Sequence, residues 1–581
     1  MVEWSWDLLT EQERLVAERL AVVPAGTDLP AAVAVCSGIQ GDDPVAADDV
    51  GDLLLALVEK SLLQPVGDGL RYRMLETIRE YGVERLAERA ELDDARLRYA
   101  RYFAALTADL DPVLRTRDQL AALEVIRVER DNILGALRYL GDCGDGIAAV
   151  DLCLSLTWYW SMIGADGESR IWLEFALSAD GADRHPDRAY AEGARAISRI
   201  ASGEMPGPGG WDEARDELRH IAARLSASPP PRVAALAVLA PMLGYFGGDN
   251  ALAESLIDPI LHSPDPWVRA TARTGRAAFA ENAGDTDLLR ADVEAAYLDF
   301  ERIGDRWGLS SILASRGLVR TMDGDLAGAM ADYERALAHS RELGSREDTL
   351  LIHIRMASVS SRRGDFDSAR AYVQIGKDQM AGQPQFTDRA LIADGVLVMT
   401  MWFSGDRDEA LVLCADLRSR IAGPTGDDPM REHVVALVRS ATGYIAARSG
   451  DIVAAATDLR MSYPAAVATK DMPIAAVAGV GMAALAQALG EAETGAIMLG
   501  AAARVRGSDD MTDPAIVLVT ADLRRALGER FTEKYDEGKG LATPRAVAAL
   551  APQRLRSAIR RHGAETGSVE EVDDGLAVGL G

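Results

Sequence analysis

The residues that most often perform chemistry are scattered along this chain of 581 residues. The histidines form no HExxH motif or other close pair of the kind that binds zinc. No GxSxG motif is present to hold a nucleophilic serine, and the cysteines form no CxxC pair. The sequence therefore predicts no metal, no cofactor and no catalytic centre, and a protein that is not an enzyme. The residues concerned are His185, His220, His262, His339, His353, His433, His562, Cys36, Cys143, Cys153 and Cys414.

A phosphate-binding loop is also missing from the sequence. No GxxxxGK[ST] motif occurs, and the nearest fragments, Gly376-Lys377 and Gly538-Lys539, lack both the loop glycines and the following hydroxyl. The formal net charge of −28 gives an acidic surface that repels phosphate backbones. We therefore expect no nucleotide hydrolysis and no general binding of nucleic acid.

What the sequence does repeat is a turn, which recurs eight times at intervals of 36 to 45 residues. Five positions after the first glycine of each turn stands a small residue in seven of the eight cases, and nine positions after it stands an apolar one in all eight. A fixed period of this size predicts stacked helical hairpins that form a right-handed solenoid. The turns are Gly209-Gly210, Gly248-Asp249, Gly284-Asp285, Gly324-Asp325, Gly364-Asp365, Gly405-Asp406, Gly450-Asp451 and Gly490-Glu491.

The clearest unit, Trp307 to Leu343, resembles the tetratricopeptide repeat. In this unit Gly324 is expected to end the first helix and Asp325 to cap the second. The positions that carry the resemblance are small, small, aromatic and small: Gly317, Ala329, Tyr333 and Ala336. The resemblance implies that the first helix of each hairpin lines a concave groove, and that the groove binds a partner.

Exposed aromatic and arginine side chains are typical anchors of binding surfaces. Carried over from the repeat motif, the groove side should hold Tyr245, Phe246, Arg362, Met399, Trp402, Phe403, Tyr444 and Arg448. The alternative for each aromatic residue is that it packs between helices. Residues 158–160 (Trp-Tyr-Trp) lie in an apolar run and are expected in the core.

Residues 1–92 do not follow the repeat. Thr10 and Glu13 have the spacing of a capping box, Asp28 can cap a second helix, and residues 50–58 read as a third. Two short strands around residues 67–69 and a helix from Leu75 to about residue 90 would complete a winged helix. Its 18 acidic and 8 basic residues give a net charge of −10, the wrong sign for DNA, although direct DNA binding stays an alternative.

The remaining composition is that of a cytoplasmic protein. The four cysteines are expected to be buried, reduced thiols. The N-terminus has no basic-then-apolar signal, and no apolar run reaches the roughly 20 residues that a membrane span requires.

Three segments resemble one region of large actinobacterial transcriptional regulators of the STAND ATPase class, of the antibiotic-regulatory-protein and LuxR-like types. They read WSWDLLTEQERLVAERLAVVPAG, LVEKSLLQPVGDGLRYRMLETIREYGVERL and RYARYFAAL…VERDNILGALRYL, and residues 500–550 are similar to the usual end of such proteins. In that family an NB-ARC-like ATPase domain precedes a winged helix and tetratricopeptide-like repeats. The ATPase should precede Trp4, and neither it nor a family DNA-binding domain is expected in this chain.

These observations together predict an all-α fold with one small hairpin and five regions: a winged-helix module (1–92), a helical linker with the first hairpins (93–200), tetratricopeptide-like repeats (201–505), a C-terminal helical cap (506–563) and a disordered acidic tail (564–581). The expected function is the sensor and partner-binding region of a transcription-regulating STAND-type protein. The partner would be a protein, such as an ATPase or regulator domain acting in cis or in trans, or a small-molecule or peptide effector. A scaffold unrelated to transcription is the alternative.

Overall fold

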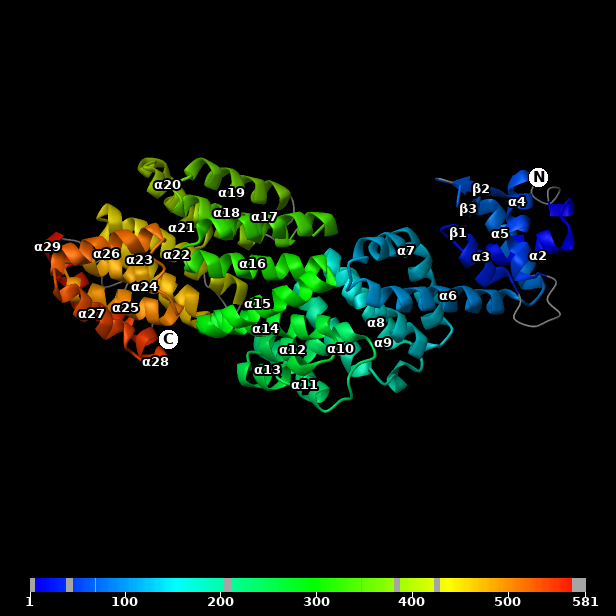
Figure 1. The fold of residues 1–581 in the computed structure, drawn as a ribbon, viewed down its shortest axis with the longest axis horizontal. Coiled ribbons are helices and arrows are strands. Elements are labelled where there is room, and N and C mark those ends of the chain that lie inside the picture. The colour runs from blue at the N-terminus through cyan, green and yellow to red at the C-terminus, as the bar shows by residue number, and fades with distance from the viewer. Residues whose placement is uncertain are drawn as a thin grey trace. The chain divides into compact units, whose positions relative to one another are not determined.

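The computed structural model describes residues 6–37, 45–67, 69–202, 210–345, 347–380, 387–422 and 429–566 (Figure 1). The chain divides into two compact units: residues 1–204 with 218–243, and residues 205–217 with 244–581. The boundaries predicted at residues 92, 200, 505 and 563 stay predictions. Most of the predicted acidic tail, residues 567–581, lies outside the described residues, and residues 564–566 belong to the last helix.

The first unit begins with three helices and a small sheet. Its helices and strands are α2 (Glu11–Leu20), β1 (Thr27–Asp28), α3 (Leu29–Cys36), α4 (Val50–Glu59), β2 (Leu63–Val66), β3 (Arg71–Met74), α5 (Glu76–Glu88), α6 (Leu92–Val113), α7 (Gln119–Asp142), α8 (Gly146–Ile163), α9 (Asp166–Ser178) and α10 (Arg188–Ala201). Helix α11 (Gly210–Ser226) and helix α12 (Leu239–Phe246) each have residues in both units.

The helix caps of the N-terminal module form as the sequence predicts. Thr10 and Glu13 form the reciprocal capping box of α2, with the Thr10 amide donating to Glu13 Oε2 over 2.7 Å. Asp28 accepts from the amide of Ala31 at the start of α3. Each cap satisfies an amide at a helix N-terminus that would otherwise have no partner.

The sheet has three strands instead of the predicted two. Strand β3 pairs antiparallel with β2 on one side and with β1 on the other, in the order β1-β3-β2. Strand β1 consists of Thr27 and Asp28 alone, which is too short to show the alternation by which a strand is recognised in a sequence.

A polar network fixes the N-terminal module to α7. Asn132 is fully buried; its side chain donates to the carbonyl of Gly26 over 2.9 Å and accepts from the amide of Ala25 over 3.0 Å. Beside it, Arg71 of β3 pairs with the buried carboxylate of Glu129. Buried polar groups of this kind are costly to leave unpaired, so residues on either side of position 92 belong to one packed body.

Helix α8 contains the apolar run of residues 158–160, and the core position predicted for them is confirmed, since they are 8%, 5% and 1% exposed. By length and composition α8 passes as a possible membrane span, with a mean hydropathy of 1.3, but 72% of it is buried inside the fold. Burial of this extent is what a core helix of the unit requires.

The second unit is an array of helical hairpins. Its helices are α13 (Asn250–Ile257), α14 (Pro266–Ala283), α15 (Thr286–Ile303), α16 (Arg306–Met322), α17 (Leu326–Leu343), α18 (Glu347–Arg362), α19 (Phe366–Met380), α20 (Thr387–Ser404), α21 (Arg407–Arg420), α22 (Pro429–Ser449), α23 (Ile452–Ala468), α24 (Met472–Ala488), α25 (Ala492–Arg506), α26 (Pro514–Leu527), α27 (Arg530–Lys539), α28 (Thr543–Ala549) and α29 (Arg556–Thr566). The helical repeat fold predicted from the turns is thus confirmed, and each predicted turn that lies wholly in the described part of the chain joins the two helices of one hairpin.

The turn glycines confirm the predicted register. Seven of them have φ between +72° and +100°, a conformation that glycine adopts at little cost. The aspartate that follows the glycine caps the second helix in most units; the carboxylate of Asp325, for example, accepts from the amide of Gly328 over 2.9 Å. Asp406 is an exception, because its carboxylate instead accepts from Ser404 over 2.7 Å and pairs with Arg370. The seven glycines are Gly248, Gly284, Gly324, Gly364, Gly405, Gly450 and Gly490.

Small residues set the close approach of paired helices, as predicted. Ala329 is fully buried, and Tyr333 is 1% exposed. A Cβ atom added at Gly317 of α16 would lie 2.6 Å from Cε1 of Tyr333, so only glycine fits against that ring. The same hairpin is crossed by a buried ion pair, in which the guanidinium of Arg316 donates to both carboxylate oxygens of Asp332 over 2.9 and 2.7 Å.

The array curls until helices far apart in sequence meet. Helix α14 contacts α24, and the end of α25 lies against the turn before α15. A Cβ atom at Gly284 would lie 2.3 Å from the carbonyl oxygen of Val505, and Thr286 donates to the carbonyl of Gly507 over 3.2 Å. The concave side of the array is therefore bordered by the segment that follows α25.

One prediction about the cysteines is wrong. Cys36, Cys153 and Cys414 are buried and form no disulfide, as expected, but Cys143 is exposed. It follows the last residue of α7 at the turn into α8, where a side chain points away from the packed helices.

Candidate binding cavity

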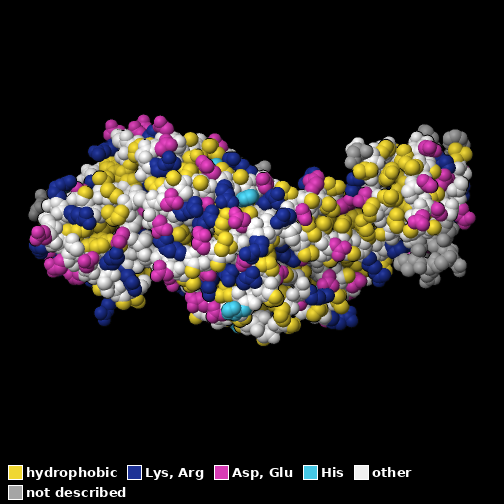
Figure 2. All heavy atoms as spheres, viewed as in Figure 1, with side chains coloured by type: hydrophobic (Ala, Val, Ile, Leu, Met, Phe, Trp, Pro, Cys, Tyr) yellow, Lys and Arg dark blue, Asp and Glu magenta, His cyan; other side chains and the backbone are white. Residues whose placement is uncertain are grey.

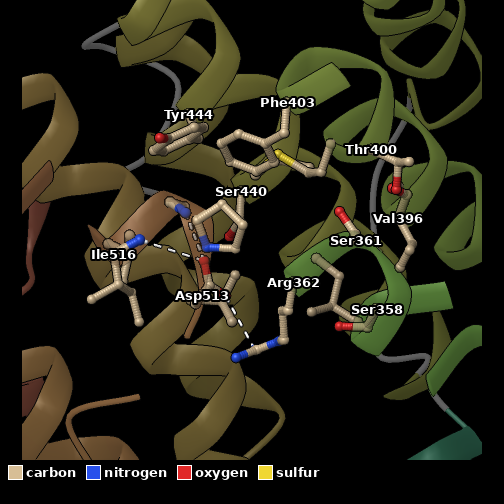
Figure 3. Close-up of a pocket in the computed structure, with 18 of the residues that line it drawn as sticks. Ser358, Ser361, Arg362, Val396, Thr400, Phe403, Ser440, Tyr444, Asp513 and Ile516 are labelled. Atoms are coloured by element: carbon tan, nitrogen blue, oxygen red, sulfur yellow. Dashed lines mark hydrogen bonds and ion pairs between the residues drawn. The ribbon is translucent and has the colours of Figure 1, made fainter. Parts of the chain in front are cut away.

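A cavity of about 370 Å³ lies inside the second unit (Figure 3). Its walls come from the first helices of successive hairpins, α18, α20, α22 and α24, and from the start of α26. Most of its lining is apolar, including Ile354, Ile392, Val396, Leu437, Val480 and Ile516. Cavities of this size and character are typical of small-molecule sites.

Four of the eight predicted groove residues line this cavity together. They are Arg362, Met399, Phe403 and Tyr444, contributed by α18, α20 and α22. In Figure 3, Phe403 and Tyr444 lie side by side at the top of the cavity, and their ring centroids are 6.2 Å apart. The first helices of these three hairpins thus contribute predicted residues to one cavity.

Trp402 does not lie in the cavity, which corrects the groove position expected for it. It is 8% exposed, belongs to the hydrophobic core, and has the guanidinium of Arg407 over its ring at 5.1 Å. Phe403 follows it on α20, and one residue turns a helix by about 100°, so only one of the two adjacent rings can face the cavity. Trp402 is a packing residue.

The other three predicted residues lie elsewhere in the second unit. Tyr245 stacks on Phe279 with ring centroids 4.6 Å apart, and its hydroxyl bonds Asn282. Phe246 is 46% exposed at the end of α12. Arg448 extends to α26 and pairs with Asp522 over 2.5 Å. The two aromatic pairs thus differ in environment, although their positions before the turn glycine are the same.

Arg362 anchors the segment that borders the cavity. Its guanidinium donates to Asp510 over 2.5 and 3.0 Å, to Asp513 over 3.3 Å and to the hydroxyl of Thr512 over 2.8 Å. Burial by itself would lower the pKa of Arg362, but the carboxylates of Asp513 and Asp510 outweigh burial and raise it. Asp510 adopts φ +45°, an unusual conformation that these contacts hold in place.

Arg506 also lines the cavity but has a different environment. It is 9% exposed, and within the described ranges its guanidinium forms no hydrogen bond or ion pair. Burial lowers the pKa of Arg506, and the more distant carboxylates of Asp510 and Asp513 offset this only in part. Arg362 forms the close contacts with these two carboxylates, so Arg506 is a buried cation that is only partly compensated.

Two hydroxyl groups from α18 belong to the polar part of the lining. Ser358 and Ser361 line the cavity one turn apart, and neither hydroxyl bonds to any other residue that the structure describes. Figure 3 shows the Ser361 side chain facing the space below Phe403. The cavity therefore has mostly apolar walls that carry a few hydroxyl donors and three arginines, of which Arg506 is the one without a hydrogen bond or ion pair in the described ranges.

The sequence did not reveal Ser358, Ser361, Arg506 or Asp513 as site residues. The two serines follow the helix period toward the concave side, a signal that was available but weak. Arg506 and Asp513 lie 144 and 151 residues beyond Arg362 and come to the cavity only because the array curls. In the described part of the chain, no group of three or more His, Cys, Asp or Glu residues is placed to hold a metal ion.

The N-terminal module exposes acidic and apolar side chains close together in the sequence. On and just before α4, the third helix of the module, the side chains of Asp48, Asp49, Asp52 and Glu59 are exposed. Leu55, Val66 and Leu70 are 54%, 47% and 70% exposed, and Figure 2 shows hydrophobic side chains gathered over the strands. Exposed apolar side chains between acidic ones are typical of a protein-binding surface.

Sequence comparison places the chain near regulators of transcription. No family model matches it. Proteins of Mycobacterium tuberculosis and Mycobacterium bovis named "Putative HTH-type transcriptional regulator" are 29% identical over 357 residues, which cover 59% of this chain and 35% of each relative. Proteins of the same species named "Uncharacterized protein" are 35% identical over 103 residues, 17% of this chain and 25% of theirs. The chain thus matches about a third of the length of the regulators.

Comparison with solved structures gives weak matches, among them the following two. A STAND protein with a tetratricopeptide-repeat sensor from Pyrococcus horikoshii aligns over 93% of this chain and 66% of its own, with a TM-score of 0.34 and 13% identity. Yeast Tom70 aligns over 75% of this chain and 99% of its own, with a TM-score of 0.28 and 12% identity. By sequence, therefore, the chain is a distant relative of mycobacterial proteins named as transcriptional regulators.

Proposed function

We propose that this protein is the non-enzymatic sensor region of a transcription regulator of the STAND type, and that an effector binds in the cavity between α18, α20, α22 and α24. The observation that carries the proposal is the cavity itself. Its walls come from one helix of each successive hairpin, and the segment around Asp510 is held against them by Arg362. A ligand in this place touches several repeats at once and can favour one curvature of the array over another.

The N-terminal module completes the proposal. Its helices and three strands follow the order of a winged helix, and its exposed Leu55, Val66 and Leu70 suit a contact with a protein domain. We propose that this surface packs against an ATPase or regulator domain, in cis or in trans. Exposed carboxylates on α4 oppose the alternative of direct DNA binding. The proposed location is the cytoplasm.

Filling the cavity tests the proposal. Gly395 lies on α20, and a Cβ atom there would lie 3.7 Å from its nearest neighbour, Cγ2 of Val438, so a larger side chain can enter the cavity. Wild-type protein and the Gly395→Leu variant are each immobilised and exposed to one bacterial cytoplasmic extract, and the retained small molecules and proteins are identified by mass spectrometry. We expect species that bind the wild type and not the variant.

Two controls sharpen this experiment. Ala338→Leu adds a similar side chain at an exposed position of α17 and should retain what the wild type retains. The N-terminal module is tested separately, by titration of duplex DNA at two salt concentrations, where no salt-dependent binding is expected. If Gly395→Leu and the wild type retain the same species, recognition lies outside the cavity and a general scaffold becomes the better description.

A further inference from the structure

We propose that the cavity binds a small apolar molecule carrying one anionic group, and that Arg506 pairs with that anion. The inference rests on the function proposed above and names the chemistry of the effector. It begins from a cation that is nine-tenths buried at the wall of a mostly apolar cavity.

The balance of charge in the lining favours an anion. Three arginines line the cavity, Arg355, Arg362 and Arg506, against one carboxylate, Asp513. Arg355 donates to the carbonyl of Ala314 over 2.9 Å, and Arg362 is held by its four contacts with the segment 510–513. Arg506 alone keeps all of its donors for a ligand.

A buried, unpaired guanidinium costs free energy, because a charge is taken out of water without a partner. A guanidinium stays protonated at any physiological pH, so the protein cannot avoid this cost by releasing the proton. A ligand carboxylate or sulfonate would offset it with charge-assisted hydrogen bonds in a place from which water is largely excluded. Ser358 and Ser361, with free hydroxyls, can donate to further ligand oxygens.

The apolar residues of the lining determine the size and the apolar character of the ligand. Met399, Phe403 and the ring of Tyr444 offer an aromatic and polarisable surface, and Val396 and Ile516 close the sides. A volume of about 370 Å³ suits one or two fused rings or a medium-length alkyl chain and is too small for a folded peptide element. An acidic protein segment is therefore the less suitable occupant.

Two fluorescent probes that differ only in the anion test the proposal. 1-Anilinonaphthalene-8-sulfonate carries a sulfonate, and N-phenyl-1-naphthylamine has the same rings without it. We expect the wild-type full chain to bind the sulfonate probe at least about tenfold more tightly. Arg506→Gln should weaken the sulfonate probe by about 10- to 100-fold, as the loss of hydrogen bonds to a charged group implies, and leave the neutral probe unchanged. Arg504→Gln, an exposed arginine on the same helix, is the matched control and should change neither.

The melting temperature of Arg506→Gln distinguishes a loss of binding from a loss of structure. Because the substitution removes an unpaired buried charge, this temperature should equal or exceed that of the wild type. If that variant does not fold, Arg506→Lys takes its place and should keep part of the preference for the sulfonate. Equal affinity of the two probes for the wild type, or an Arg506→Gln variant with wild-type affinity for the sulfonate, overturns the inference. Should Gly395→Leu block both probes in that case, the cavity of the proposed function stands and only the anion is wrong; should it block neither, both proposals fail.

Discussion

Substitution of Asp471 tests the contact between α14 and α24 at which the array curls on itself. It caps α24, where its carboxylate accepts from the amide of Ile474 over 3.1 Å. Burial raises its pKa from 3.8 to about 6; the Ile474 hydrogen bond and His433 act in the opposite direction, and the nearby Glu281 of α14 adds to the rise. The carboxylate therefore lies where the two ends of the curled array meet, and its ionisation opposes their contact.

The sign of the pH effect follows from the raised pKa. Folded protein binds the proton of Asp471 more tightly than unfolded protein does, so the free energy of unfolding falls as the pH rises from about 4 to about 6 and stays low above that. The shift from 3.8 to about 6 corresponds to about 3 kcal/mol lost at pH 7.5 and about 1.6 kcal/mol lost at pH 5. Asp471→Asn keeps an oxygen to cap α24 and removes the charge.

We therefore expect Asp471→Asn to be more stable than the wild type, by about 3 kcal/mol at pH 7.5 and by about half of that at pH 5. Urea unfolding at the two pH values, followed through the transition of the second unit, measures this difference, and titrating groups that do not interact with Asp471 cancel between the two proteins. Asp451→Asn is the control, because Asp451 caps α23 in the same way but is exposed. A difference that is the same at both pH values, or a variant less stable at pH 7.5, would refute the placement of Asp471.

Further predictions concern close packing and chemistry. Gly395→Ala should stabilise the second unit by roughly 0.5–1 kcal/mol, because the added Cβ has room and glycine within a helix is costly. Gly317→Ala should destabilise the unit by roughly 1–3 kcal/mol, because its Cβ would lie 2.6 Å from the Tyr333 ring. If urea unfolding ranked the two variants the other way, the helix packing would be contradicted. Ala329→Leu should cost roughly 1–3 kcal/mol while Ala338→Leu costs little, because the first position is fully buried and the second exposed; equal melting temperatures would show the repeat register to be wrong. No ATP hydrolysis above a buffer blank is expected, and turnover in a phosphate-release assay would disprove this.

Most of the fold could be predicted from sequence patterns within single hairpins. The turn glycines required φ values that few other residues adopt, and the small residues five positions later required close helix contact, so the order of hairpins could be predicted without coordinates. The two-residue strand β1 was not predicted, because its pairing with β3 joins residues that are 45 positions apart, Thr27 and Tyr72. The burial of Trp402 was not predicted. Adjacent helix positions differ by about 100° in direction, and the motif did not resolve whether Trp402 or Phe403 faces the cavity.

The sequence by itself determined a helical repeat array with its turns, and an N-terminal module with a net charge of −10. Only the tertiary structure decided that the array curls until α14 meets α24, that Arg362 holds the segment 510–513, and that Arg506 stands unpaired at the cavity wall. The physical reason is how far apart in the sequence the interacting residues are. Turn conformation and helix packing within a hairpin depend on residues a few positions apart, whereas curvature sums small rotations over many repeats, and contacts over about 150 residues follow from that sum.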